Sequence, residues 1–332
     1  MTDVQQVDRV EVLVLIDNVT DSLSTNPPFV TAEWVGLHRA QRLPTLSGDR
    51  ICVAHHGLSL LITAFMNGTR RTVLFDTGPH GSTLLRNADL LAVDFGDIDA
   101  VVLSHGHWDH VGGVVDAVAR IRAADNTRRV SCHVHPDMFV QRATRRPEGD
   151  CIVHAAIADP GMLTAAGASV VSTRDAELVC DGMFHVSGEV PRVTTYETGL
   201  PGHVRRAADG SWEDDPLIMD ERFISVHVRG KGIMVFSACS HAGIINVLMH
   251  ARSLFPRVPL YGTMGGLHLS GSTEAIIPQS VADLATFDLK LIAAGHCTGW
   301  RAQAALARVF GDRLVPSAVG KRYVIPHLIP DT

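Results

Sequence analysis

The feature that most constrains this chain is the segment at residues 104–110, which reads Ser-His-Gly-His-Trp-Asp-His. It places three imidazoles and one carboxylate within six positions. The four side chains are those of His105, His107, Asp109 and His110. These groups bind zinc and other first-row metal ions. Because the apolar run 100–103 comes directly before them, we expect a strand that ends in a metal-binding loop.

The spacing within this segment predicts two metal ions rather than one. His105 and His107 can converge on a single ion. Asp109 and His110 are expected to face a second ion, because neighbouring side chains on a tight loop cannot all point at one centre. The alternative is an accidental surface cluster in a chain that holds 18 histidines. The preceding strand and the helix entry Val111-Gly112-Gly113 favour the metal site.

Length and composition favour one large domain. The chain has 332 residues, enough for one domain or two, and its 46% hydrophobic content is ample for a buried core. We predict a single domain over residues 1–332, with residues 1–9 flexible because they are polar and acidic.

Charge and hydropathy exclude several classes of protein. The formal net charge is −6, and no run of lysine or arginine is present to neutralise phosphates, so a nucleic-acid partner is not expected. Apolar stretches fall short of the roughly 20 residues that span a bilayer, and residues 1–9 do not resemble a secretion signal. Six cysteines without paired spacing suit a reducing compartment. We therefore predict a cytoplasmic protein with a small-molecule substrate, and a homodimer is possible.

Hydrophobic periodicity predicts alternating strands and helices in both halves of the chain. The expected strands are residues 10–16, 51–55, 58–65, 71–75, 100–103, 130–135, 183–186, 223–228, 232–237, 260–264 and 289–293. The expected helices are residues 82–91, 113–123, 244–253, 278–286 and 301–309. Residues 142–164 and 196–220 are expected to be loops that cover a substrate. Two similar halves predict an α/β fold in which two sheets pack face to face with helices outside.

Four motifs together resemble a known family. Residues 105–110 match the His-x-His-x-Asp-His signature of the metallo-β-lactamase superfamily. With Cys-Ser-His-Ala-Gly-Ile-Ile-Asn at 239–246, Gly-Gly-Leu-His-Leu at 265–269 and Gly-His-Cys-Thr-Gly at 295–299, the chain resembles one subgroup. That subgroup comprises metal-dependent hydrolases similar to 7,8-dihydropterin-6-methyl-4-(β-D-ribofuranosyl)aminobenzene-5′-phosphate synthase. The resemblance implies a four-layer αββα sandwich.

The resemblance also implies further metal ligands at later strand ends. His296 follows an apolar strand and corresponds to the last metal histidine of the superfamily. Cys239 stands where an Asp or a Cys binds the second ion, and His241 is a rival ligand two residues later. Glu189 stands where many members have a histidine, so it is a further candidate. The cofactor we expect is a pair of divalent ions, zinc in preference to manganese or iron.

A dinuclear site of this kind predicts hydrolysis by a metal-bound hydroxide. Asp109 would bind the second ion and orient the nucleophile or accept its proton. Asp76 is expected to support a ligand or the metal loop through hydrogen bonds. His268 is our candidate for the acid that protonates the leaving group, or for a substrate contact. The residues expected to grip an anionic substrate are His56, His135 and Arg192.

The predicted activity is therefore hydrolysis of a small ester, with phosphate esters and lactones ahead of lactams. The first alternative is a pterin-type synthase or transferase that acts on a phosphorylated aromatic substrate. A second is a non-catalytic, metal-binding regulator, although the strong motifs keep their ligands. A third is oxidative chemistry at iron, which metal analysis with a visible spectrum would distinguish.

Overall fold

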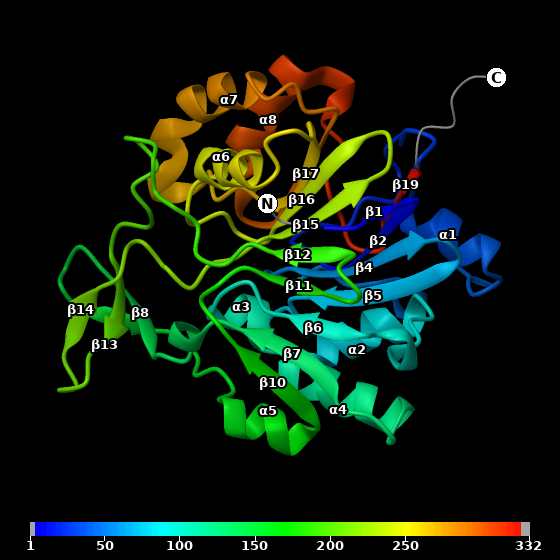
Figure 1. Ribbon diagram of the computed structural model, residues 1–332, viewed down its shortest axis with the longest axis horizontal. Coiled ribbons are helices and arrows are strands. Elements are labelled where there is room, and N and C mark those ends of the chain that lie inside the picture. Colours follow the sequence, from blue (N-terminus) through cyan, green and yellow to red (C-terminus); the bar gives the residue numbers. More distant parts are fainter. Residues whose placement is uncertain (1–3, 327–332) are drawn as a thin grey trace.

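The computed structural model describes residues 4–326, which fold into two facing sheets with helices on both outer sides (Figure 1). This is the four-layer αββα sandwich that the sequence predicted. The first sheet has the strand order β10-β7-β6-β5-β4-β2-β19-β3. The second has the order β11-β12-β15-β16-β17-β18, with the short strand β1 paired to β15.

The strands of both sheets are short to medium in length. In the first sheet they are β2 (Arg9–Ile16), β3 (Val30–Thr31), β4 (Ser59–Met66), β5 (Thr69–Phe75), β6 (Ala100–Val102), β7 (Val130–Val134), β10 (Ala168–Ser172) and β19 (Arg322–Pro326). In the second they are β1 (Gln6–Val7), β11 (Glu177–Val179), β12 (Phe184–Val186), β15 (Ile224–Val228), β16 (Gly232–Ser237), β17 (Leu260–Gly266) and β18 (Leu291–Gly295).

Helices cover the outer face of each sheet. The helices of the first half are α1 (Glu33–Arg39), α2 (Gly81–Leu90), α3 (Trp108–Val111), α4 (Val114–Ala124) and α5 (Pro160–Ala166). Those of the second half are α6 (Ile244–Leu254), α7 (Ile277–Ala285) and α8 (Trp300–Phe310). Short 3-10 turns are at Gly48–Arg50, Phe95–Asp97, Pro136–Met138, Gly271–Ile276, His296–Thr298 and Gly311–Arg313. In Figure 1, α2, α4 and α5 lie below the first sheet, and α6 to α8 lie above the second.

The sandwich is held together by strands that are apolar on both faces. In β2, Val10, Val12 and Val14 join the core between the two sheets, whereas Leu13 and Leu15 join the core beneath the helices. This alternation follows from the two-residue period of a strand. Because both faces of the sheet are covered, the strand reads as a nearly continuous apolar run.

A third, small sheet is the main departure from the prediction. Its order is β14-β13-β8-β9, and its strands are β8 (Arg142–Arg145), β9 (Cys151–Val153), β13 (His203–Arg206) and β14 (Trp212–Asp214). It lies to one side of the sandwich (Figure 1). All four strands come from regions 142–164 and 196–220, which we expected to be loops. The strands are short and largely exposed, so they carry little apolar periodicity.

Three smaller expectations also differ from the structure. Residues 51–55 form an extended loop rather than a strand, in which the His55 amide donates to the Asp17 carbonyl. Residues 6–9, expected to be flexible, contribute to β1 and β2, and Val7 is fully buried; residues 1–3 lie outside the described range. The C-terminal strand β19 was not predicted. The single domain remains a prediction, and no helix within residues 4–326 has the length and apolarity needed to cross a membrane.

Candidate metal centre

The candidate ligands meet where strands of the two central sheets end. The loop that follows β6 carries the residues 104–110, and the loop that follows β16 carries Cys239 and His241. His268 follows β17, and His296 follows β18. Because β5, β6 and β7 run parallel, as do β16, β17 and β18, each set of strands ends at one edge of its sheet.

The backbone is strained at several of these positions. Asp76, Ser240, His268 and His296 have φ values of 58°, 58°, 43° and 48°, in the left-handed region that non-glycine residues rarely adopt. Such conformations persist only where the surrounding structure holds them, and they concentrate at functional sites. The strain therefore supports a functional role for this edge of the sandwich.

His110 and His296 point their Nε2 nitrogens at each other. The Nδ1 of His110 lies 2.7 Å from Oδ2 of Asp76, and the Nδ1 of His296 lies 3.0 Å from Oδ1 of Asn18. That Asn18 oxygen also accepts a hydrogen bond from the Gly57 amide, so both Nδ1 atoms must donate. Nε2 of His296, a neutral ring, therefore carries a lone pair, whereas Nε2 of His110, which lies 3.1 Å from it, must give up a proton before it can bind an ion.

Asp109 completes this group. Its Oδ2 lies 3.8 Å from Nε2 of His110 and 3.5 Å from Nε2 of His296. It also lies 3.3 Å from Nε2 of the exposed His56 ring. A carboxylate and two imidazole Nε2 atoms that converge in this way are stabilised by a cation between them, either the proton that His110 holds or a divalent ion. The donor set therefore fits a divalent ion, and we name His110, Asp109 and His296 the second ion group.

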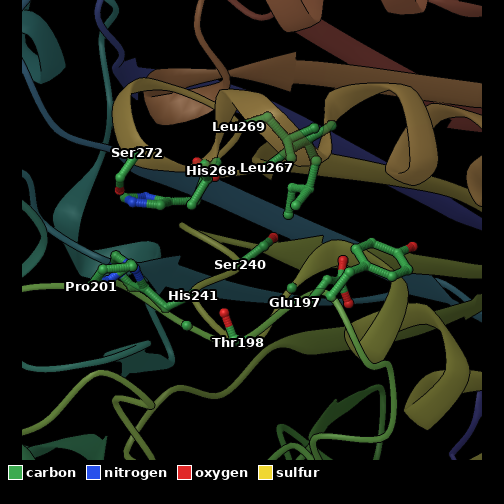
Figure 2. Close-up of a pocket in the computed structure, with 14 residues that line it drawn as sticks. Glu197, Thr198, Pro201, Ser240, His241, Leu267, His268, Leu269 and Ser272 are labelled. Atoms are coloured by element: carbon green, nitrogen blue, oxygen red, sulfur yellow. Dashed lines mark hydrogen bonds between the residues drawn. The ribbon is translucent and has the colours of Figure 1, made fainter.

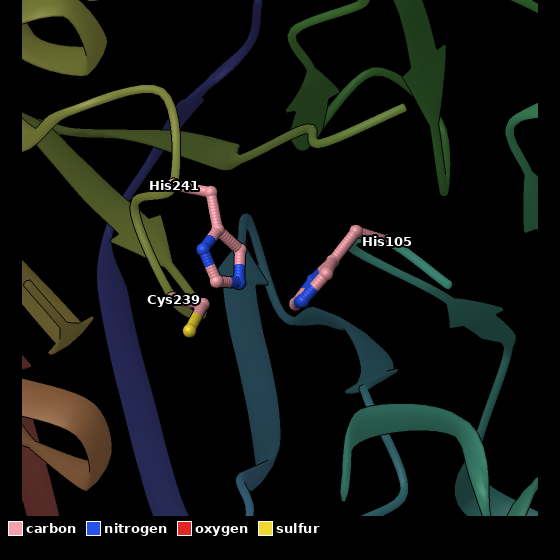
Figure 3. Close-up of side chains that lie close together, drawn as sticks. All are labelled: His105, Cys239 and His241. Carbon is pink, nitrogen blue, oxygen red and sulfur yellow. The ribbon is translucent and has the colours of Figure 1, made fainter. Parts of the chain in front are cut away.

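A first ion group lies beside it. Nε2 of His105 is 3.0 Å from Nδ1 of His107, and the His241 ring lies 4.8 Å from each of these rings. Both ring nitrogens of His241 are buried without a hydrogen-bond partner. Figure 3 shows His241 and Cys239 on one loop, with His105 reaching toward them from the opposite side. We name His105, His107 and His241 the first ion group.

Cys239 lies between the two groups. Its sulfur belongs to a cluster with His105 and His241 and to another with His110 and His296, and the ligand atoms of each cluster lie within 4.8 Å of one another. The sequence made Cys239 and His241 rivals for one position. The structure brings both to the centre, with Cys239 shared and His241 on the first group.

Asp76 holds the metal loop in place through hydrogen bonds. Its carboxylate accepts hydrogen bonds from the Ser104 amide (2.8 Å), the Ser104 hydroxyl (2.7 Å) and Nδ1 of His110. Because the Ser104 proton goes to Asp76, the Ser104 oxygen accepts from Nδ1 of His105 at 2.8 Å. Asp76 is fully buried, so these contacts fix the ligand rings in place.

Burial keeps most of these imidazoles neutral. It lowers the pKa values of His105, His107 and His241 well below their ordinary value, and that of His296 to about 4. His110 is the exception, because Asp109 and Asp76 outweigh burial and raise its pKa to about 9. Neutral imidazole is the form that binds metal ions.

Two buried carboxylates hold the loop that carries His241. Glu221 accepts hydrogen bonds from the amides of His241 and Ala242, each at 2.7 Å. Glu197 accepts from the amide of Ile245 at 2.9 Å, at the start of α6. The loop is thus fixed at both ends, which favours a preformed site.

A pocket opens beside the first ion group. His241 and His268 lie on two sides of it, together with Leu267, Leu269 and Glu197 (Figure 2). Nδ1 of His268 lies 3.3 Å from the Cys239 sulfur. Burial alone would lower the pKa of His268, but the Cys297 sulfur and Glu221 raise it, so the ring can carry a proton.

Three predicted site residues are engaged elsewhere. The Glu189 carboxylate lies 3.2 Å from the buried His135 ring and 3.2 Å from Arg174. Arg192 donates to the backbone carbonyls of Val190 and Leu217. Of the predicted substrate-binding residues, the structure therefore brings His56 to the centre but not His135 or Arg192, and Glu189 does not join either ion group.

Two histidines that the sequence reading missed lie beside His107. Nε2 of His203 is 2.9 Å from Nε2 of His107, and the His154 ring lies 5.8 Å from the His107 ring. His203 is in β13 of the third sheet, and His154 directly follows β9 of the same sheet. The signal that could have found His203 is Asp209-Gly210, a strong hairpin turn between Val204 and Trp212.

Comparisons with known proteins agree with this geometry. A family model described as the metallo-β-lactamase superfamily matches residues 53–204, which include the metal loop. The curated 7,8-dihydropterin-6-methyl-4-(β-D-ribofuranosyl)-aminobenzene-5′-phosphate synthase of Methanocaldococcus jannaschii is 28% identical over 255 residues, covering 75% of this chain and 83% of that protein. An uncharacterised protein of the same organism is 29% identical over 273 residues, 81% of this chain and 93% of its own length.

Solved structures share the fold. Tm1679, described as a metal-dependent hydrolase of the β-lactamase superfamily, has a TM-score of 0.68 at 21% identity, over 96% of this chain and 99% of its own. Unliganded yeast PDE1 has a TM-score of 0.52 at 10% identity, over 97% of this chain and all of its own length. The chain thus has the metallo-β-lactamase fold, and its residues 53–204, which include the metal-binding loop, match the model of the metallo-β-lactamase superfamily.

Proposed function

We propose that this protein is a dinuclear metal-dependent hydrolase that acts on a small ester, with phosphate esters and lactones favoured. The observation that carries the proposal is the pair of ion groups, each with imidazole nitrogens facing each other at 3.0 or 3.1 Å. When bound, two divalent ions would lower the pKa of water and polarise a substrate oxygen. Zinc suits the imidazole and thiolate donors, and manganese and iron are alternatives.

The chain's own residues supply the remaining steps. Asp109 lies on the second ion group and can orient a water molecule or accept its proton. His268 lines the neighbouring pocket with a raised pKa, so it can donate a proton to a leaving group. His56 lies on the exposed side of Asp109, so it can contact the part of the substrate that lies away from the pocket.

The pocket beside His241 suits a substrate with both apolar and polar parts. Leu267, Leu269 and Ile276 offer apolar surface, while Thr198 and Ser272 offer hydroxyl groups. We place the part of the substrate that does not react in this pocket. The six free cysteines suit the proposed cytoplasmic location, and a homodimer remains a proposal.

A second candidate is transfer rather than hydrolysis. The observation that favours it is the pterin synthase of M. jannaschii, which is 28% identical and covers 75% of this chain. In that case the same ion groups would hold a phosphorylated aromatic substrate, and a second substrate would replace water. A non-catalytic metal-binding role has less support, because the pocket adjoins the metal centre.

Activity of the metal-reconstituted protein decides between these candidates. We would test aryl phosphodiesters, phosphotriesters, lactones and a β-lactam, with His110→Ala as the blank and EDTA as the control for metal. We expect hydrolysis of an ester that EDTA and His110→Ala both abolish. Activity that survives both treatments would contradict the proposal. If every ester fails while a pterin condensation proceeds, transfer replaces hydrolysis.

A further inference from the structure

The His107 ring has an imidazole on each side. Its Nδ1 lies 3.0 Å from Nε2 of His105, and its Nε2 lies 2.9 Å from Nε2 of His203. A neutral imidazole carries a proton on one nitrogen only, so the position of that proton decides which nitrogen can bind an ion. If the proton were on Nδ1, His107 could not serve the first ion group.

A backbone carbonyl settles the position of this proton. Nδ1 of His203 lies 2.7 Å from the carbonyl oxygen of Asp215, which can only accept a hydrogen bond. Nδ1 of His203 therefore donates, and its Nε2 keeps a lone pair. The His107 Nε2 must then donate to His203, which leaves Nδ1 of His107 unprotonated and facing His105. His203 is 1% exposed, so water does not compete for these contacts.

The third sheet also holds the residue before His107. The Gly106 amide donates to Oδ2 of Asp220 at 2.8 Å, and Arg142 of β8 donates to Oδ1 of the same carboxylate at 2.5 Å. A side chain at Gly106 would not fit, because its Cβ would lie 2.2 Å from the Met138 carbonyl oxygen. Arg142 and His203 belong to paired strands, so one small sheet supports two successive residues of the metal loop, Gly106 through Asp220 and His107 directly.

We propose that His203 is a positioning residue for the metal centre: by accepting a hydrogen bond from His107, it selects the His107 tautomer that can bind the first ion. The third sheet would then control one ion group and not the other, since His110 and His296 are held by Asp76 and Asn18. The proposal rests on the dinuclear centre proposed above but not on the reaction that it catalyses.

The test compares two substitutions of His203 in the full-length protein. His203→Leu removes the acceptor, whereas the side-chain oxygen of His203→Gln can still accept from His107. Zinc affinities would be measured by competition with a chelator, and cobalt absorption spectra would report the ligand environment. We expect His203→Leu to weaken one of two ions by roughly 10- to 100-fold, the range found for residues that support metal ligands. His203→Gln should restore that affinity to within a few-fold.

The control is another buried histidine. His133 pairs with Glu177 at 2.9 Å and is outside both ion groups, so His133→Leu should leave both zinc affinities unchanged. If His203→Leu fails to fold, His203→Asn takes its place, because its side chain is polar but too short to reach His107. Melting curves of each variant without metal identify such a failure.

Three results would overturn the proposal. The first is unchanged binding of both ions in His203→Leu. The second is equal weakening in the leucine and glutamine variants, which would mean that the shape of the ring matters and not its acceptor. The third is binding of three ions, one of which is lost in His154→Leu, because His107, His154 and His203 also lie close enough to hold an ion directly. A wild-type protein that binds no ion would instead contradict the proposed function.

Discussion

The two ion groups differ in what holds their imidazoles. His110 and His296 donate to Asp76 and Asn18, which follow β5 and β2 of the central sandwich. His105 donates to the hydroxyl of Ser104, and His107 faces His203 on the third sheet. The residues that hold the second ion group thus follow strands of the first central sheet, whereas the first ion group depends partly on the small third sheet.

The charges around the two groups differ as well. The second group has the Asp109 carboxylate beside it and Asp76 behind it, whereas the first has only neutral imidazoles and shares Cys239. A carboxylate behind a ligand histidine raises the basicity of the ring, and a carboxylate ligand offsets the charge of the ion. The second group should therefore bind its ion more tightly. Substitutions and chelators should therefore remove the ion of the first group before they remove the ion of the second group.

The largest effect is expected from Asp109. Asp109→Asn keeps the shape of the side chain but removes its negative charge and its capacity to accept a proton. We expect activity to fall by roughly 10²- to 10⁴-fold, with loss of the tighter ion. His107→Ala should instead remove the weaker ion. Metal content and initial rates check both variants, and a single ion that neither variant changes would rule out the dinuclear centre.

Substitutions of Cys239 and His241 are expected to affect the two ion groups differently. Cys239→Ser should weaken both ions, because the sulfur lies in clusters with ligands of each group. His241→Ala should weaken only the ion of the first group. We expect changes of at least the roughly tenfold to hundredfold that supporting residues produce. Stepwise zinc titrations measure both, and full metal occupancy in both variants would show that this loop provides no ligand.

Asp76→Asn is expected to reverse the order of the two affinities. Three donors, the Ser104 amide, the Ser104 hydroxyl and His110 Nδ1, use both oxygens of Asp76, and asparagine has only one acceptor oxygen, so at least one donor loses its partner. The ion of the second group should bind roughly 10- to 100-fold more weakly. The same titration measures the change, with Asp116→Asn, on the surface of α4, as the matched control. An unchanged order would mean that Asp109 alone makes the second group tighter.

The smallest effect on the metal centre is expected from His185, which lies in β12 outside both groups. Burial lowers its pKa to about 4, and neither ring nitrogen has a partner. As pH falls below the ordinary value of 6.5, the unfolded chain takes up a proton before the folded protein does. The contribution of the neutral His185 ring to the free energy of unfolding should therefore be fully present above pH 6.5. It should decrease by about 3 kcal/mol between pH 6.5 and 4.

Replacing this histidine separates acid unfolding from acid loss of metal. His185→Leu should flatten the dependence of stability on pH in that window while leaving zinc affinity at pH 7 unchanged. Denaturant titrations of the metal-free protein at several pH values measure the first effect. A variant that unfolds in acid as the wild type does would show that other groups control this transition.

Local sequence patterns were sufficient to predict much of the sandwich and part of the centre. The strands β4 and β5, the helices α2, α4 and α6, and the metal loop each follow from patterns within a short stretch of sequence. His105 and His110 could be identified because their neighbours in the sequence are also their neighbours in space.

Contacts between distant residues could not be read in this way. β8 pairs with β13, which lies about 60 residues later in the chain, and the pairing brings His203 to His107. The apolar pattern within either strand does not predict this contact. The position of Glu189 was assigned by resemblance alone, and its carboxylate is instead occupied by His135 and Arg174.

The place of β19 has a consequence for how the protein is made. This strand, at Arg322–Pro326, lies between β2 and β3 and pairs with both, although they precede it by about 300 residues. During synthesis the first strands leave the ribosome long before their partner exists, so β2 has one open edge for most of that time. His296 is also made late. We therefore expect a ribosome-bound chain halted before residue 322 to be open to proteases and to need chaperones, and the metal centre to load only after His296 has left the ribosome.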